Sequence, residues 1–301
     1  MVLHPQAAAA MAAQETAPKV TDPGFDVVAT RAADREAALA EPREEVEHVV
    51  DLDADGVLVR LHRPAAGPGG PAGLVLHLHG GGFVLNDIDV HDAAVRRLAN
   101  RSGLAVLSVA YRKPPEHRFP AAPDDVSTVV RWLAAGGLAT LGLPDDVPLF
   151  AHGDSAGGNL ALVAALRHPG RFAALALIYP FLDPQMAGDS YADALAGFDR
   201  GQAEWYWQQY AASPADLRDP DLAPLLSDGL AGLPPTLVVT AEHDPVRDEG
   251  ELLATRLAEL GVEVVATRYL GLVHGFWRHP QVFAAAEPLT RQVAGFLRQH
   301  V

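Results

Sequence analysis

Strand-like and helix-like stretches alternate along most of this sequence, and this alternation constrains the fold more than any other feature. Short apolar segments with strand character lie at 74–79, 104–110, 147–152, 173–179, 236–241 and 262–269. Segments with helical periodicity lie between or after them, at 90–101, 124–135, 155–167, 249–260 and 280–299. Continuously apolar strands separated by helices are typical of a parallel sheet covered on both faces. We therefore expect an α/β fold.

Two further strand-like segments precede this pattern. Residues 46–51 and 57–62 flank the sequence Asp53-Ala-Asp-Gly56, which is typical of a hairpin turn. The hairpin brings the expected sheet to about eight strands, most of them parallel.

Two regions fall outside the alternation. Residues 183–235 are Pro-rich and aromatic, with a helix expected at 202–211, and about 50 residues is too long for an ordinary connection between strands. Residues 1–45 are rich in Ala, Asp and Glu. We expect both regions to form a helical cap over one catalytic domain made of residues 46–182 and 236–301.

The alanine run at 7–13 has no basic segment before it, so we interpret it as a poorly ordered start or a helix lead-in and not as a secretion signal. The chain contains no cysteine, which excludes disulfides, a thiolate nucleophile and a Cys-based zinc site. Both observations loosely favour a cytoplasmic protein.

Charge argues against two classes of partner. The 38 acidic and 23 basic residues give a formal net charge of −15, which would repel a nucleic-acid backbone or an anionic bilayer. The longest apolar runs fall far short of the roughly 20 residues that a transmembrane helix needs. We expect neither nucleic-acid binding nor stable membrane insertion.

The sequence Gly153-Asp-Ser-Ala-Gly157 lies between a predicted strand and a predicted helix. A sharp strand-to-helix turn needs small residues around a central nucleophile, which here is Ser155. Asp154 or Ser155 could instead cap the helix. Gly-Lys-Ser/Thr is absent, which excludes a phosphate-binding loop.

A run of three glycines, Gly80 to Gly82, follows the strand at 74–79. Such a backbone can approach a ligand closely and direct N–H groups at a developing oxyanion. We assign the donors as the N–H groups of Gly81, Gly82 and Ala156, with Gly80 as the alternate. His79 is interpreted as a scaffold residue for this loop.

His77 and His79 alternate with leucines and suggest a metal pair. The sequence offers no third ligand beside them, so no metal site is predicted.

A serine nucleophile needs a base, and the order nucleophile, acid, histidine guides the choice among thirteen histidines. Asp244 follows the strand at 236–241, and His274 follows the strand at 262–269. We predict His274 as the base and Asp244 as the carboxylate that fixes its tautomer. His243, His279 and Asp248 remain alternatives, and Asp244 could be a helix cap.

These motifs together resemble the hormone-sensitive-lipase family of esterases, the bacterial family IV carboxylesterases with the α/β-hydrolase fold. The matching sequences are His-Gly-Gly-Gly-Phe at 79–83, Gly-Asp-Ser-Ala-Gly-Gly-Asn-Leu-Ala at 153–161, Ala-Glu-His-Asp-Pro-Val-Arg-Asp-Glu at 241–249, His-Gly-Phe at 274–276, Tyr-Arg at 111–112, Pro-Glu-His-Arg-Phe-Pro-Ala-Ala at 115–122 and Leu-Ile-Tyr-Pro at 177–180. Lys113-Pro114 departs from the family's Leu-Ala.

The resemblance implies a triad of Ser155, Asp244 and His274, a cap that shapes a pocket for short acyl chains, and possible homodimers. We expect a serine carboxylesterase for small, fairly hydrophobic esters, with no metal or organic cofactor. Aromatic candidates for the pocket are Phe83, Phe198, Trp205, Tyr206 and Trp207. An amidase or peptidase with the same triad, or a non-catalytic ligand-binding protein on this fold, remains open.

Overall fold

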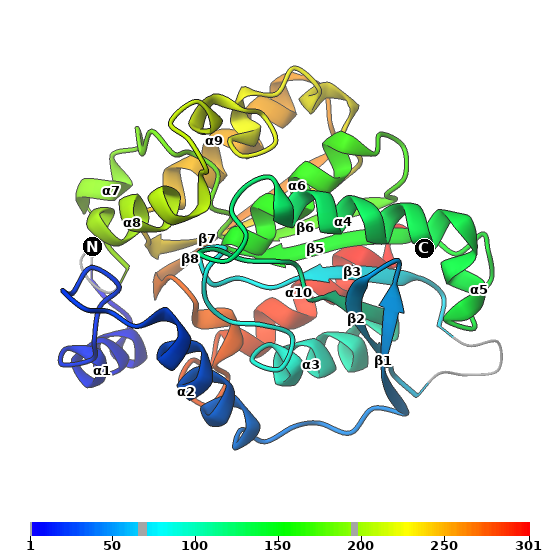
Figure 1. Ribbon diagram of the computed structural model, residues 1–301, viewed down its shortest axis with the longest axis horizontal. Helices are drawn as coiled ribbons and strands as arrows, with labels where there is room; N and C mark the ends of the chain where they lie inside the picture. Colours follow the sequence, from blue (N-terminus) through cyan, green and yellow to red (C-terminus); the bar gives the residue numbers. More distant parts are fainter. Residues whose placement is uncertain (1, 66–70, 194–197) are drawn as a thin grey trace.

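The computed structural model describes residues 2–65, 71–193 and 198–301. Within these residues, eight strands form one sheet in the order β1-β2-β4-β3-β5-β6-β7-β8 (Figure 1). The strands are β1 His48–Ala54, β2 Val57–Arg63, β3 Leu74–Leu78, β4 Ala105–Val109, β5 Leu149–Asp154, β6 Ala174–Ile178, β7 Thr236–His243 and β8 Val264–Val273. β2 runs antiparallel to both of its neighbours, and all other neighbouring pairs are parallel.

Helices cover both faces of the sheet. They are α1 Pro5–Gln14, α2 Val27–Leu39, α3 Asp92–Ser102, α4 Ala121–Trp132, α5 Leu138–Thr140, α6 Ala156–Arg167, α7 Ser190–Asp193, α8 Arg200–Tyr210, α9 Arg247–Glu259 and α10 Ala286–Arg298. α3 and α10 lie on one face, and α4 and α6 on the other (Figure 1). Every residue of the central strands β3 to β7 is buried, which explains their continuously apolar sequences.

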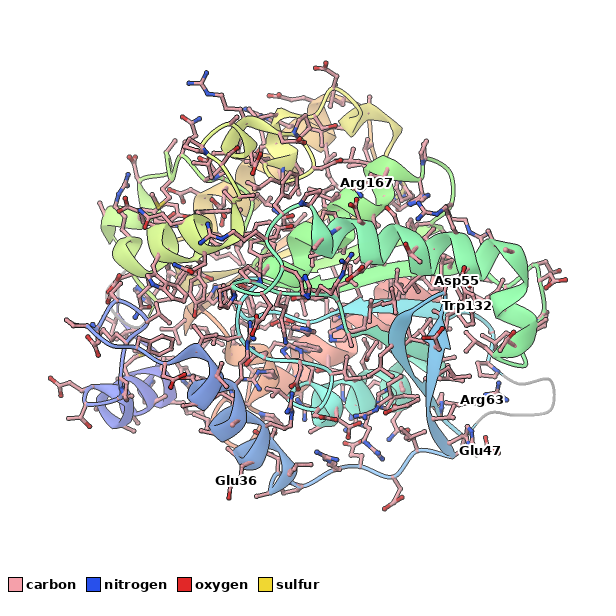
Figure 2. All side chains as sticks on the ribbon, in the orientation of Figure 1. Glu36, Glu47, Asp55, Arg63, Trp132 and Arg167 are labelled. Carbon is pink, nitrogen blue, oxygen red and sulfur yellow. The ribbon has the colours of Figure 1, made fainter. Side chains whose placement is uncertain are left out.

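The β1–β2 hairpin is tighter than its sequence predicts. Its turn consists of Asp55 and Gly56, at φ values of 54° and 89°, so both take the left-handed conformation of a two-residue hairpin turn. Figure 2 shows Asp55 at one end of this hairpin and Glu47 at the other.

At the N-terminal end the structure has the helix that was one of two interpretations of the sequence, and at the C-terminal end the predicted helix starts later. The alanine run is a helix, α1, because alanine has the highest helix propensity and Pro5 starts the first turn. His4 fixes α1 to β8 by donating its backbone N–H to the Gly271 carbonyl at 2.8 Å. The last helix starts at Ala286 and not at Pro280, because turns closed on the His279 carbonyl precede it.

The carboxyl ends of the parallel strands point toward α1, α7 and α8 (Figure 1). On this arrangement we propose that residues 1–45 and 183–235 form a cap over a catalytic domain built from 46–182 and 236–301. In the described part of the chain, no helix combines the length and the apolar character that crossing a membrane requires.

Candidate active site

Ser155 occupies a strained turn between β5 and α6. Its φ of 55° and ψ of −122° lie outside the regions that L-residues usually adopt. The Ser155 N–H donates to the Ile178 carbonyl at 2.9 Å, which fixes the turn against the neighbouring strand β6. Only glycine fits at position 157, because a Cβ there would lie 1.9 Å from the Leu78 carbonyl oxygen. The strain and the tight packing present the Ser155 hydroxyl at the end of β5.

His274 connects Ser155 to Asp244. The His274 Nε2 lies 2.9 Å from the Ser155 Oγ, and its Nδ1 lies 2.7 Å from the Asp244 Oδ2. The other oxygen of Asp244 accepts the Val246 N–H at 3.0 Å, so the carboxylate is held from both sides. Asp244 is completely buried, whereas the His274 side chain keeps 17% of its exposure. Two hydrogen bonds therefore connect a hydroxyl, an imidazole and a carboxylate that lie far apart in the sequence.

The alternative residues lie elsewhere. His243 is buried, with its Nε2 3.8 Å from a Glu242 oxygen. Asp248 accepts hydrogen bonds from the Arg247 side chain and the Ser190 N–H. His279 is at the cavity wall, where burial lowers its pKa to about 4. None of the three contacts Ser155 through the hydrogen bonds of the described residues.

The glycine run lies beside Ser155 and leaves specific amides free. The Gly80 N–H donates to the Asp154 Oδ1 at 3.0 Å, which removes the alternate oxyanion donor. The N–H groups of Gly81, Gly82 and Ala156 donate to no protein acceptor among the described residues, and Ala156 is the first residue of α6. They are the three amides assigned as oxyanion donors in the sequence analysis, and that assignment stays a prediction.

His79 stands behind this loop. Its ring stacks on Tyr111 with 4.2 Å between ring centroids, and its Nδ1 lies 2.8 Å from the Gly80 carbonyl oxygen. Burial lowers the pKa of His79 to about 3, so the ring is neutral and Nδ1–H donates to that carbonyl. This is the scaffold position expected of it. Burial also raises the pKa of Asp154 to about 6.

A buried histidine cluster was missed by the sequence analysis. His77 and His91 lie with Asp154 such that one ligand atom of each is within 4.8 Å of the others, so a third potential ligand stands beside His77 after all. Nothing in the spacing of His91 pointed to it. Burial and the nearby Arg278 guanidinium lower the pKa of His91 well below its usual value. The same positive charge would oppose a bound cation, so the donor set does not suit a metal ion.

A cavity of about 780 Å³ opens at His274. Its wall is formed by Ala10, Met11, Ala12, Glu15, Ala17, Pro18, Lys19, Leu85, Phe198, Gln202, Tyr206, Val273, His274, Gly275, Arg278, His279 and Phe283. Phe198 and Tyr206, two of the predicted pocket residues, line this cavity, and their contact with substrate stays a prediction. A separate hollow of about 440 Å³ between α9 and β8 contains no triad residue.

Three aromatic pocket candidates are not on this wall, and those predictions are corrected. Phe83 is fully buried and stacks on Tyr210 with 3.8 Å between ring centroids, and Trp207 is also buried beside it. Trp205 packs edge-on against Phe25 and Tyr206 and is not part of the wall. Aromatic content alone could not separate buried aromatic residues from those of the pocket wall, because the surroundings of each residue depend on the position of α8.

Side chains of helix α2 form hydrogen bonds with the loop that follows the glycine run. The Arg31 Nε donates to the Val84 carbonyl at 2.8 Å, and its Nη1 lies 2.9 Å from a Glu116 oxygen. Arg35 donates to Asp87 at 2.9 Å. Lys113, where the sequence departs from the family pattern, donates to the Asn86 carbonyl, and burial lowers its pKa to about 8. The departure therefore acts on the shape of this loop and not on the triad.

Comparison with known proteins places the chain among esterases. A family model described as the alpha/beta hydrolase fold matches residues 75–278. An ethyl acetate hydrolase of Pseudomonas putida is 35% identical over 278 residues, covering 88% of this chain and 87% of the relative. The carboxylic ester hydrolase LipN of Mycobacterium tuberculosis is 36% identical over 294 residues, covering 92% and 77%.

Solved structures agree with the sequence matches. A hyperthermophilic esterase from the archaeon Pyrobaculum calidifontis superposes with a TM-score of 0.89 at 34% identity, covering 99% of both chains. The match extends over the sheet, the flanking helices and the segments above the strand ends. The chain therefore belongs to the hormone-sensitive-lipase family of α/β-hydrolases, the bacterial family IV carboxylesterases, and is an enzyme of the carboxylic ester hydrolase class.

Proposed function

We propose that the protein is a serine carboxylesterase that hydrolyses short-chain, fairly hydrophobic esters through an acyl-enzyme on Ser155. The observation that carries the proposal is the pair of contacts at His274, 2.9 Å to the Ser155 Oγ and 2.7 Å to the Asp244 Oδ2. A histidine so placed can take the serine proton while the carboxylate holds the other ring nitrogen protonated.

In the first half-reaction, the Ser155 Oγ attacks the ester carbonyl carbon and its proton passes to the His274 Nε2. The resulting oxyanion accepts hydrogen bonds from the free amides of Gly81, Gly82 and Ala156. As the tetrahedral intermediate collapses, the bond to the alcohol oxygen breaks and His274 protonates that oxygen. The alcohol leaves, and the acyl group remains on Ser155.

In the second half-reaction, His274 removes a proton from a water molecule, and the hydroxide attacks the acyl carbonyl carbon. The second oxyanion uses the same amides. The bond to the Ser155 oxygen then breaks, the proton returns from His274 to Ser155, and the acid is released. These residues supply the complete cycle without a further group.

The wall of the cavity supports the substrate preference. Met11, Leu85, Phe198 and Phe283 present apolar surface to a volume of about 780 Å³, which suits a small ligand with a modest apolar acyl chain. One relative is named an ethyl acetate hydrolase, and ethyl acetate is a small ester.

The direct test is Ser155→Ala assayed on p-nitrophenyl acetate and butyrate. We expect turnover to fall by about 10³-fold or more, because the nucleophile is lost. Ser108→Ala is the matched control, since Ser108 is a fully buried serine of β4 whose hydroxyl has no partner among the described residues. Unchanged turnover in Ser155→Ala would refute the proposal.

Two further measurements separate the alternatives. A fluorophosphonate probe should label the wild type and not Ser155→Ala; a non-catalytic binding protein would not react. A p-nitroanilide matched to the ester should be cleaved far more slowly, because an amine is the poorer leaving group. Equal rates on the two substrates would indicate an amidase.

A further inference from the structure

Arg278 holds a fixed position beside the triad. It ends a 3₁₀ turn, Phe276–Arg278, that begins two residues after His274. Phe276 and Trp277 are completely buried, and the Arg278 carbonyl accepts a hydrogen bond from the Arg97 Nη2 at 3.1 Å. The backbone that carries this side chain is therefore anchored on both sides.

Among the described residues, the guanidinium of Arg278 donates a hydrogen bond through only one of its three nitrogens. Its Nη1 donates to the Val90 carbonyl at 3.3 Å, and none of the ion pairs among the described residues includes it. Within residues 2–65, 71–193 and 198–301, its Nε and Nη2 donate to no acceptor, and neither atom is sealed from solvent. Arg278 lines the same cavity as His274. A guanidinium with two open N–H directions in a concave site can accept a carboxylate in a two-pronged contact.

The other charged groups on this wall are less suited to bind an anion. Lys19 is exposed and lies 3.8 Å from Asp199. Glu15 is exposed, and His279 is neutral near pH 7 because burial lowers its pKa to about 4. Arg278 is half-buried, so water screens its charge less than that of Lys19.

Two carboxyl groups act on Arg278 through space without contacting it. They are Asp34 and Asp154, and burial is the main cause that raises the pKa of each, that of Asp154 to about 6. Neither lies within 4.0 Å of the guanidinium. They reduce the local positive charge, but neither accepts a hydrogen bond from the Nε or Nη2 of Arg278.

We infer that, among esters with short apolar acyl chains, the site favours those whose chain ends in a free carboxylate, the monoesters of dicarboxylic acids, with Arg278 as the residue that binds that carboxylate. This inference rests on the proposed ester hydrolysis and adds its substrate class. The contact is made equally in the ground state and the transition state, because the carboxylate takes no part in the reaction. It should therefore act mainly on KM.

The test compares monomethyl succinate, glutarate and adipate with their dimethyl esters near neutral pH, following acid release. The three chain lengths allow for the unknown span between Arg278 and the reacting carbonyl. For the best length, Arg278→Gln should lower the ratio of kcat/KM for monoester over diester by about tenfold, mostly through KM. Arg278→Lys keeps the charge, and its ratio of kcat/KM for monoester over diester should lie between those of the wild type and Arg278→Gln.

Lys19→Gln is the control, because it removes the other cation of the same wall and should change that ratio less than about twofold. A ratio that is the same in the wild type, Arg278→Gln and Lys19→Gln overturns the inference. If Arg278→Gln does not fold by circular dichroism, Arg278→Lys carries the comparison, and a ratio equal to the wild type then counts against the two-pronged contact.

A binding measurement distinguishes failure of the carboxylate site at Arg278 from failure of the proposed ester hydrolysis on Ser155. Adipate should bind to Ser155→Ala by calorimetry and not to the double variant Ser155→Ala/Arg278→Gln. Binding that is lost with Arg278, in a protein that hydrolyses no ester, would support the anion site and refute the esterase. Hydrolysis of neutral esters without any monoester preference or adipate binding would do the reverse.

Discussion

The histidines around Ser155 fall into two electrostatic classes. His79, His91 and His152 are fully buried, and burial lowers the pKa of each far below its usual value, so they are neutral hydrogen-bonding groups. His274 is partly exposed and has a buried carboxylate at 2.7 Å. A general base must become positively charged during the reaction, and His274 combines a carboxylate partner with reach to the Ser155 hydroxyl.

Replacing Asp244 with asparagine keeps the shape of the residue and removes its charge. The amide can no longer select the Nδ1–H tautomer or stabilise the imidazolium, so we expect kcat to fall by about 10³–10⁴-fold with a small change in KM. Asp248→Asn is the matched control, from the first turn of α9 four residues further on, and should cost less than about threefold in kcat. A larger loss in Asp248→Asn than in Asp244→Asn would reassign the acid.

Asp154 makes the stability of the fold depend on pH. Its pKa is about 6 in the folded protein against 3.8 in the unfolded chain, because burial disfavours the charged form. Between those pH values the folded state keeps a proton that the unfolded state has lost. Its contribution to the free energy of unfolding is therefore most favourable below about pH 4, and it is lost as the pH rises through about 6.

Asp154→Asn removes this dependence while keeping an oxygen that can accept from Gly80. We expect the variant to equal the wild type in stability below about pH 4 and to exceed it by up to about 3 kcal/mol above about pH 6. Urea unfolding across this pH range measures the difference. Asp145→Asn, at an exposed position, should show no such trend, and a constant difference for Asp154→Asn would contradict the argument.

At the scale of elements, the sequence predicted the central strands well because their burial leaves a local signal. All residues of β3 to β7 are buried, and their apolar runs are visible without neighbours. The meeting of Ser155, Asp244 and His274 was also predictable, since each follows a strand whose carboxyl end reaches the same edge of the sheet. Helix ends were less certain, as the late start of α10 shows, because turn hydrogen bonds decide them.

Contacts between distant elements left no signal in the sequence. Arg31 lies in a helix near the N-terminus, yet its side chain reaches Val84 and Glu116. His91, directly before α3, joins His77 and Asp154 only because α3 packs on α10, β4 and β2. Such positions follow from how the helices pack on the sheet, and periodicity along the chain does not contain that information.

The contacts of α2 predict that Arg31 positions the loop of Gly81 and Gly82. Arg31→Met should lower kcat by about tenfold with little change in KM, because looser amides stabilise the oxyanion less. Binding of a trifluoromethyl ketone, which forms an oxyanion on Ser155, should weaken in parallel. Arg291→Met removes an equivalent side chain from an exposed ion pair on α10, and equal losses in both variants would mean a general loss of stability.

At the scale of the whole molecule, the three hydrogen-bonded side chains and most of the cavity wall belong to different structural elements. The triad side chains stand on the ends of β5, β7 and β8, which the core of the sheet holds rigidly. The cavity wall comes from α1, from α8 and from the turns after His274, which meet only in the folded protein. Substrate preference can therefore change through the wall while the chemistry at Ser155 stays in place.

Helix α1 allows a test of whether the wall controls substrate preference, by placing a tryptophan at each of two adjacent positions. Ala10 lines the cavity, whereas Ala9 is exposed on the outside of the helix. A tryptophan at position 10 would fill part of the volume, so Ala10→Trp should lower the ratio of kcat/KM for p-nitrophenyl octanoate over acetate by about tenfold or more. Ala9→Trp should leave that ratio close to the wild-type value, because the ring would face solvent. Similar ratios in both variants would mean that α1 does not limit the acyl chain, and the wall would then have to be assigned to α8 and the turns after His274 alone.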